Sequence, residues 1–115
     1  MELKDYQKFC QTTAGNMSDD PEKQIMVWGL GVAGEAGDLA GCIKKTVGHK
    51  NDQITGIREN LGDTMWYIAE ICNFYHWDLN EILSENVSKL KKRYPKGFDA
   101  KLVKRDGKRI DWNEK

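Results

Sequence analysis

Two pairs of acidic residues are spaced so that the members of each pair share one side of a helix. Glu35 and Asp38 are three residues apart, and Glu59 and Asp63 are four apart, spacings that bring side chains onto the same helical face. If the two helices packed antiparallel, four carboxylates would come together, as in the carboxylate metal sites of helical bundles. No histidine accompanies these acids, so the oxygen ligands favour Mg²⁺ or Mn²⁺ over zinc. A solvated acidic surface is the alternative that this pattern leaves open.

Basic residues supply the opposite charge that a phosphate-bearing ligand requires. Lys44 and Lys45 lie about two turns beyond Asp38, and Lys89 and Arg93 lie in the last turns of a later helical segment, where cations also interact favourably with the helix dipole. The net charge is zero, but residues 1–88 hold 7 Lys/Arg and 14 Asp/Glu, whereas residues 89–115 hold 11 and 4. This asymmetry favours one part that handles cations and another that handles anions, although solvation of a helix end also explains such a run.

Aromatic residues and glycines lie close to the acidic pairs in the sequence. Trp28, Trp66 and Tyr67 could stack on a base, although core packing is the more frequent fate of aromatic residues at helical spacing. Trp66 and Glu70 are expected on the same face as Glu59 and Asp63, opposite an apolar stripe. Each glycine inside a helix costs about 1 kcal/mol relative to alanine, so a run of them needs a reason. Close packing is the first explanation, and approach of a ligand the second, for the strip formed by Gly34, Gly37 and Gly41.

Four predicted helices must position these residues. Apolar residues at three- and four-residue spacing predict helices over 2 to about 12, 21 to about 48, 52 to about 72 and 79 to about 93. Asp19 or Asp20 is expected to cap the second helix, Asn51 or Asp52 the third and Asp78 the fourth. The fourth helix is expected to bury Ile82, Leu83, Val87 and Leu90. The sequence therefore predicts an all-α, four-helix bundle-like fold, followed by a loosely ordered basic tail with an extended piece around residues 101–104.

Composition limits the other classes of protein. The chain has 115 residues, of which 39% are hydrophobic, which suits one packed domain. No apolar run approaches the roughly 18 residues of a membrane span, and the first residues lack the pattern of a secretory signal, so we expect a cytoplasmic protein. The three cysteines, Cys10, Cys42 and Cys72, form no C-x-x-C pair and are interpreted as buried thiols.

Several segments resemble the MazG-like nucleoside triphosphate pyrophosphohydrolases, an all-α superfamily. The similar segments read GEAGDLA at 34–40, IKK at 43–45, ENLGDTMWYIA at 59–69 and NVSKLKKRYPKGF at 86–98. Their order and spacing match that family over about residues 25–98. The resemblance implies a MazG-like helical domain over residues 1–98 and a basic C-terminal tail over residues 99–115.

The resemblance also implies a set of site residues. The family's metal-binding E-x-x-E corresponds to Glu35 and Asp38, and its E-x-x-D corresponds to Asn60 and Asp63. Asn60 removes one negative charge, so metal affinity should fall unless Glu59 acts from the preceding position. The catalytic residues implied are Glu35, Asp38, Glu59 and Asp63, the metal ligands Glu35, Asp38, Asn60 and Asp63, and the substrate-binding residues Lys44, Lys45, Asn86, Lys89, Arg93 and Tyr94.

The function implied is Mg²⁺-dependent hydrolysis of a nucleoside triphosphate to a monophosphate and pyrophosphate, with Mn²⁺ as a second possible metal. Glu35 or Glu59 would take the proton of the attacking water. Two alternatives stay open: a nucleotide-binding or sensing protein in which Asn60 has weakened catalysis, and a helical interaction module whose basic tail touches nucleic acid. Because so short a chain buries little surface, a homodimer or homotetramer is expected. For the enzyme, neither a membrane nor a nucleic acid partner is expected, and the preferred base and sugar stay open.

Overall fold

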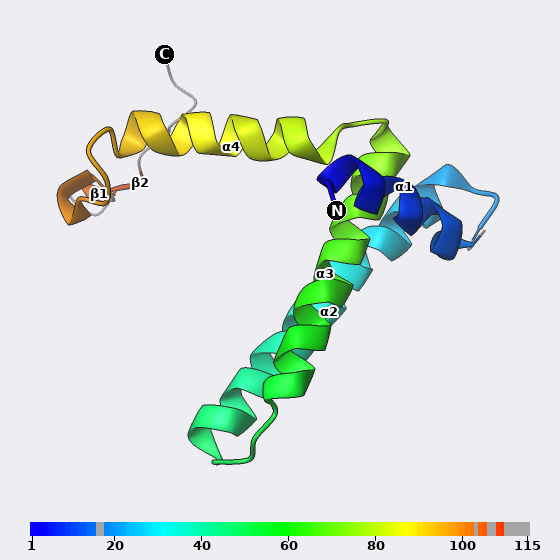
Figure 1. Cartoon of the computed structure of the whole chain (residues 1–115), viewed down its shortest axis with the longest axis horizontal. Coiled ribbons are helices and arrows are strands. Elements are labelled where there is room, and N and C mark those ends of the chain that lie inside the picture. The colour runs from blue at the N-terminus through cyan, green and yellow to red at the C-terminus, as the bar shows by residue number, and fades with distance from the viewer. Residues whose placement is uncertain (16–17, 103, 106–107, 110–115) are drawn as a thin grey trace. The chain divides into compact units, whose positions relative to one another are not determined.

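Four α-helices account for most of the described residues (Figure 1). The computed structural model describes residues 1–15, 18–102, 104–105 and 108–109. The helices are α1 (Leu3–Ala14), α2 (Pro21–Gly48), α3 (Ile54–Tyr75) and α4 (Leu79–Arg93). The all-α prediction is therefore confirmed. The chain divides into two compact units, Met1–Leu79 and Asn80–Lys115, and each is described by itself.

The predicted capping residues explain where α2 and α3 begin. The Asp20 carboxylate accepts a hydrogen bond from the Glu22 backbone N–H at 3.0 Å, and Pro21 occupies the first helical position. The N-cap position of α3 is Gln53, whose side chain makes no capping bond, and the preceding Asp52 carboxylate accepts from the Ile54 backbone N–H at 3.0 Å. Both carboxylates satisfy backbone donors that have no partner within the helix. The C-terminal end of α3 is marked by His76, which takes the left-handed conformation with φ 58°.

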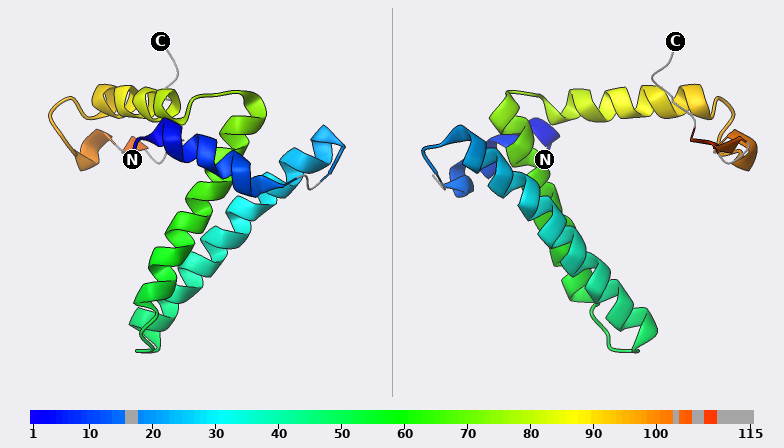
Figure 2. Two further views of the ribbon diagram at one scale, coloured as in Figure 1. Left: turned by 45° about the vertical axis from the view of Figure 1, so that its right-hand side comes forward. Right: turned by 180° about the vertical axis from the view of Figure 1, so that it is seen from behind.

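In the first unit, α2 and α3 run side by side in opposite directions, joined by the loop over residues 49–53 (Figures 1 and 2). Gly31 is required where they meet, because a Cβ at this position would clash with the Tyr67 ring. No such neighbour surrounds Gly34, Gly37 or Gly41 among the described residues. The close packing expected along that glycine strip is therefore absent within the described chain, and it occurs at Gly31 instead.

The α1 helix is joined to α3 and to the turn after it by a polar network. The Asn73 side-chain amide donates both to the Gln7 carbonyl at 3.0 Å and to the Glu70 carboxylate at 2.9 Å. The Gln7 side chain donates to the Trp77 carbonyl and accepts from the Leu79 backbone N–H. Glu70 is only 5% exposed, so a solvated acidic surface, the alternative left open for this face of α3, does not include Glu70. Its amide partner explains how a carboxylate can be buried there.

The buried core of the described chain is small. It consists of Cys10, Trp28, Ala69, Cys72 and Leu79, with Glu70 as the buried polar residue. The prediction of buried thiols is thus confirmed for Cys10 and Cys72, whereas Cys42 is only half-buried. No helix among the described residues combines the length and the hydropathy that crossing a membrane requires.

The second unit contains α4 and a short basic segment. A 3₁₀ turn, η1 (Ala100–Leu102), precedes strand β1 (Lys104–Arg105), which pairs antiparallel with β2 (Lys108–Arg109). The extended piece expected at 101–104 was therefore misplaced, because residues 100–102 turn and the strand begins at 104. The rest of the predicted tail, at 103, 106–107 and 110–115, lies outside the described residues. Burial along α4 was also overestimated, since these residues are 40–48% exposed: Leu83, Val87 and Leu90.

Candidate active site

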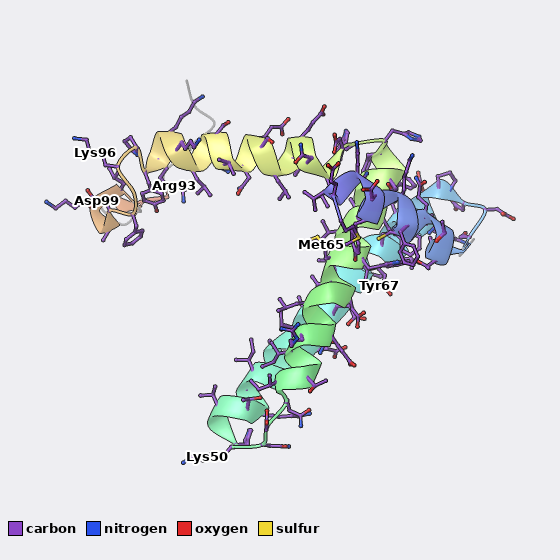
Figure 3. The ribbon with its side chains drawn as sticks, viewed as in Figure 1. Lys50, Met65, Tyr67, Arg93, Lys96 and Asp99 are labelled. Atoms are coloured by element: carbon purple, nitrogen blue, oxygen red, sulfur yellow. The ribbon has the colours of Figure 1, made fainter. Side chains whose placement is uncertain are left out.

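A pocket of about 340 Å³ is formed where α2 faces α3, and it is lined by residues of both helices. The lining residues are Glu35 from α2 and Asp63, Trp66 and Tyr67 from α3. Figure 3 labels Tyr67 where these two helices run together. The antiparallel packing explains this grouping, because Gly31 opposite Tyr67 and Cys42 opposite Gly56 place Glu35 level with Asp63. Two carboxylates and two aromatic rings therefore border one space.

The carboxylates of this pocket influence one another. The pKa of Glu35 is raised, first by burial and then by the negative charges of Asp63 and Asp38. Such repulsion is what a bound cation relieves. The structure thus brings Glu35 and Asp63 into one pocket, with Asp38 close enough to act on Glu35 by its charge.

Glu35 and Asp63 present carboxylate oxygens to the pocket. Carboxylate oxygens of Glu35 and Asp63 are hard ligands of the kind that Mg²⁺ prefers. A bound cation would also relieve the repulsion between their negative charges. Among the described residues, however, no group of three or more His, Cys, Asp or Glu side chains lies close enough to hold a metal ion. The arrangement therefore fits a cation that also takes oxygen ligands from its substrate and from water, as Mg²⁺ commonly does.

Asn60 and Glu59 differ in their surroundings. Asn60 is half-buried, and its side-chain amide donates to the Cys42 sulfur at 3.4 Å. This contact turns the amide of Asn60 toward α2, the helix that carries Glu35. Glu59 is exposed and does not line the pocket. Lys44 and Lys45 are also exposed, on the later turns of α2.

The remaining predicted substrate-binding residues belong to the second unit. Asn86 and Lys89 are exposed on α4, and Arg93 and Tyr94 are half-buried at its end. The Arg93 guanidinium lies 5.7 Å from the centroid of the Tyr94 ring, which in turn lies 5.6 Å from the Phe98 ring. Arg93 is labelled at the end of α4 in Figure 3. The end of α4 thus combines a cation with aromatic rings within its own unit.

The aromatic residues divide between core and pocket. Trp28 is 4% exposed and packs edge-on against Trp66, with ring centroids 5.3 Å apart. Trp66 and Tyr67 are also edge-to-face, at 5.0 Å. Core packing is therefore correct for Trp28, whereas Trp66 and Tyr67 line the pocket. The sequence analysis missed Thr13 of α1, which accepts a hydrogen bond from the Trp66 indole at 2.8 Å, because an exposed threonine carries no recognisable signal.

The fold and the pocket define an all-α protein with facing carboxylates between two antiparallel helices. The family model for the MazG nucleotide pyrophosphohydrolase domain matches residues 27–98. The chain belongs to this family, and the family description suggests nucleotide pyrophosphohydrolase activity. The resemblance inferred from the sequence is thereby confirmed.

One curated relative is informative about relationship but not about function. The chain is 34% identical to the "Gene 37 protein" of Mycobacterium phage L5 over 73 residues, which cover 59% of this chain and 64% of that protein. The match therefore spans less than two thirds of the relative's length. No solved structure matches the chain.

Proposed function

We propose that this protein is a Mg²⁺-dependent nucleoside triphosphate pyrophosphohydrolase that converts a (d)NTP to a (d)NMP and pyrophosphate. The observation that carries the proposal is the shared pocket, in which carboxylates from α2 and α3 adjoin the rings of Trp66 and Tyr67. Carboxylates and a cation suit the triphosphate, and aromatic rings suit the nucleoside. We place its action in the cytoplasm, where nucleoside triphosphates are abundant substrates.

The proposed reaction divides the work among a few side chains. Water attacks the α-phosphorus, the bond between this phosphorus and the oxygen bridging to the β-phosphate breaks, and pyrophosphate leaves. Glu35 or Glu59 takes the proton of the water, and the raised pKa of Glu35 strengthens it as a base. The residues that would hold Mg²⁺ are Glu35, Asp38, Asn60 and Asp63, and the metal would supply neutralising charge at the phosphate oxygens.

Cationic side chains of each unit are further proposed to bind the phosphates of the substrate. Lys44, Lys45, Lys89 and Arg93 would stabilise negative charge on the triphosphate and on departing pyrophosphate, with Asn86 and Tyr94 as further substrate contacts. This chemistry consists of positioning and electrostatic stabilisation, so no nucleophilic serine or cysteine is needed. We keep residues 1–98 as the catalytic domain of this proposal and residues 99–115 as its basic tail.

We also propose that the protein acts as a homodimer or homotetramer. Large apolar side chains on α2 and α3 remain 46–75% exposed: Met26, Leu30, Ile43, Val47, Ile54 and Leu61. Exposed apolar surface of this extent marks interaction sites. The open glycine strip of α2 would allow the backbone of another helix to approach closely.

A nucleotide-binding or sensing role is the second candidate. The observation that favours it is the hydrogen bond from the Asn60 amide to Cys42, because a neutral residue held in this way contributes less to a cation than a free carboxylate. In this case recognition would persist without turnover.

Product analysis separates these candidates. The protein is incubated with Mg²⁺ and a panel of ribo- and deoxyribonucleoside triphosphates, and the products are resolved by chromatography. Monophosphate and pyrophosphate in equal amounts support the enzyme. Saturable binding without products supports the sensor. If the protein yields no products and shows no saturable binding, both proposals are refuted.

A further inference from the structure

The α1 helix lies outside residues 27–98, yet it lies against α3 (Figure 2), and two hydrogen bonds join it to the stretch of α3 that lines the pocket. Near one end of this stretch, the Tyr6 hydroxyl donates to the Gly62 carbonyl at 3.5 Å, immediately before Asp63. Near the other end, the Trp66 indole N–H donates to the Thr13 hydroxyl oxygen at 2.8 Å. Both contacts reach α3 at or beside a pocket residue.

Thr13 is oriented to accept the indole N–H. A threonine hydroxyl has one hydrogen to donate and lone pairs that accept. The Thr13 hydroxyl donates its hydrogen to the Cys10 carbonyl at 3.0 Å, so its oxygen is left to accept from Trp66. The acceptor role of the Thr13 hydroxyl is therefore set within α1 and does not depend on a ligand.

The Trp66 ring is held from more than one side. Besides the bond to Thr13, its edge contacts with Trp28 and Tyr67 have centroid distances of 5.3 Å and 5.0 Å and interplanar angles of 77° and 89°. These perpendicular packings are favourable for aromatic quadrupoles. Without the hydrogen bond, the indole would keep its apolar contacts but lose the directional contact of its N–H with Thr13.

A used N–H also limits what Trp66 can offer a ligand. Indole nitrogen has a single donor and no acceptor, and that donor is taken by Thr13. Trp66 therefore presents ring atoms to the pocket, whereas Glu35 and Asp63 present negative charge. Ring surface suits the flat, uncharged part of a nucleotide better than its phosphates.

We propose that Thr13 is a positioning residue that sets the orientation of Trp66, so that α1 shapes the part of the pocket taking the nucleoside half of the triphosphate. The inference rests on the proposed function for the identity of the ligand. It adds a role for a helix outside the matched domain, and it commits Trp66 to ring contact with the nucleoside.

The test uses closely matched variants of α1 in the full chain. Thr13→Val keeps the side-chain shape but removes the acceptor, and Thr13→Ser retains it. Thr12→Val is the control, because the Thr12 hydroxyl donates in the same way to a carbonyl of its own helix, that of Phe9 at 2.6 Å, whereas the Thr13 hydroxyl also accepts from Trp66 of α3. Thr12 and Thr13 are both exposed, so neither substitution disturbs the core.

Steady-state kinetics with the best triphosphate of the panel should show a split between KM and kcat. For Thr13→Val we expect KM to rise roughly three- to tenfold, as loss of one ordered hydrogen bond predicts, with kcat within about twofold of the original. Thr12→Val and Thr13→Ser should match the unaltered protein. Inorganic tripolyphosphate, which lacks a nucleoside, should inhibit all four proteins with the same inhibition constant.

Three results would overturn the inference: an unchanged KM in Thr13→Val, an equal rise in Thr12→Val, or an equal weakening of tripolyphosphate inhibition. A protein that hydrolyses no triphosphate would refute the proposed activity separately. In that event the same variants are compared by quenching of tryptophan fluorescence on titration with a deoxynucleoside triphosphate. Weaker binding in Thr13→Val alone supports the inference, whereas equal binding or no binding by the unaltered protein overturns it.

Discussion

The carboxylates of Glu35 and Asp63 lie on facing helices and border the same pocket, so their negative charges oppose each other in the absence of a cation. A pair of this kind costs conformational stability and is useful only when something positive binds. Removing one carboxylate of a repelling site pair should lower activity without lowering stability, whereas removing a carboxylate that supports the fold should lower stability. The two measurements therefore distinguish the two roles.

For this reason Asp63→Asn should abolish pyrophosphate release while leaving the metal-free protein as stable as before, or slightly more stable. The substitution preserves shape and removes a repelling charge. Pyrophosphate release and urea unfolding without metal provide the two measurements. Glu22→Gln, a change in the first turn of α2 away from the pocket, serves as the control. Clear destabilisation of metal-free Asp63→Asn would show a structural role for this carboxylate.

Asn60 offers a second residue-scale prediction. Asn60→Asp adds a negative charge beside the proposed cation and removes the donor to Cys42, so the Mg²⁺ concentration for half-maximal activity should fall severalfold. Titrating each protein with Mg²⁺ while following pyrophosphate release measures this concentration. Cys42→Ala, which removes the acceptor of the Asn60 amide, controls for the lost contact, and Glu59→Gln tests the neighbouring carboxylate. Near inactivity of Glu59→Gln, with weaker metal binding by Asn60→Asp, would transfer the ligand role to Glu59.

At the scale of elements, the packing of α2 on α3 depends on a glycine at one position and not at its neighbours. Gly31→Ala should lower the free energy of unfolding by about 1–3 kcal/mol, because the added methyl meets the Tyr67 ring. A Cβ at Gly29 would have no neighbour within 4 Å, so Gly29→Ala should raise the free energy of unfolding by up to about 1 kcal/mol through helix propensity. Chemical denaturation of both variants measures the difference. Equal effects at the two positions would contradict this account of the helix contact.

The junction of α1 with α3 predicts a pH dependence. Burial raises the pKa of Glu70 above its ordinary 4.5, against the lowering effect of the hydrogen bond from Asn73. The folded protein then holds the proton more tightly than the unfolded chain, so stability falls as pH rises from 4.5 through the raised pKa. Glu70→Gln keeps an acceptor for Asn73 and should flatten this fall in urea unfolding between pH 4 and pH 8.

The control for this measurement is Glu85→Gln, since Glu85 is exposed on α4. Its curve of unfolding free energy against pH should follow that of the unaltered protein. If Glu70→Gln also follows it, Glu70 does not contribute to the pH dependence, and the burial argument is wrong for this side chain.

At the scale of the whole molecule, the exposed apolar residues of α2 predict self-association. Leu30→Glu replaces an exposed leucine with a charge between Met26 and the open glycine strip. A homodimer or homotetramer built on this face should therefore dissociate to monomer. Light scattering at micromolar concentration measures the mass of each protein. Lys23→Glu, an exposed change near the start of α2, is the control. A monomeric unaltered protein would refute the proposed assembly.

Much of the fold could be predicted because its signals are local. Spacing of apolar residues located the four helices of the described chain, and Asp20 caps α2 as predicted. Asp52 accepts from the first backbone N–H of α3, but from the position before the N-cap Gln53. The burial of Glu70 could not be predicted, because helical periodicity describes the faces of a single helix, whereas burial depends on which neighbour covers each face. The same reason explains the exposure of Leu61 and Ile54, which belong to an apolar stripe but lack a covering element among the described residues.

The sequence by itself determined the all-α class, the limits of the helices to within about three residues and the family, since each depends on residue type and spacing along the chain. Only the tertiary structure decided that Glu35 and Asp63 share a pocket with Trp66 and Tyr67, that Gly31 is the glycine required for packing, and that Thr13 holds Trp66. Those facts depend on the register between separate helices. Register arises from contacts between residues distant in sequence, such as Gly31 with Tyr67, which no local pattern records.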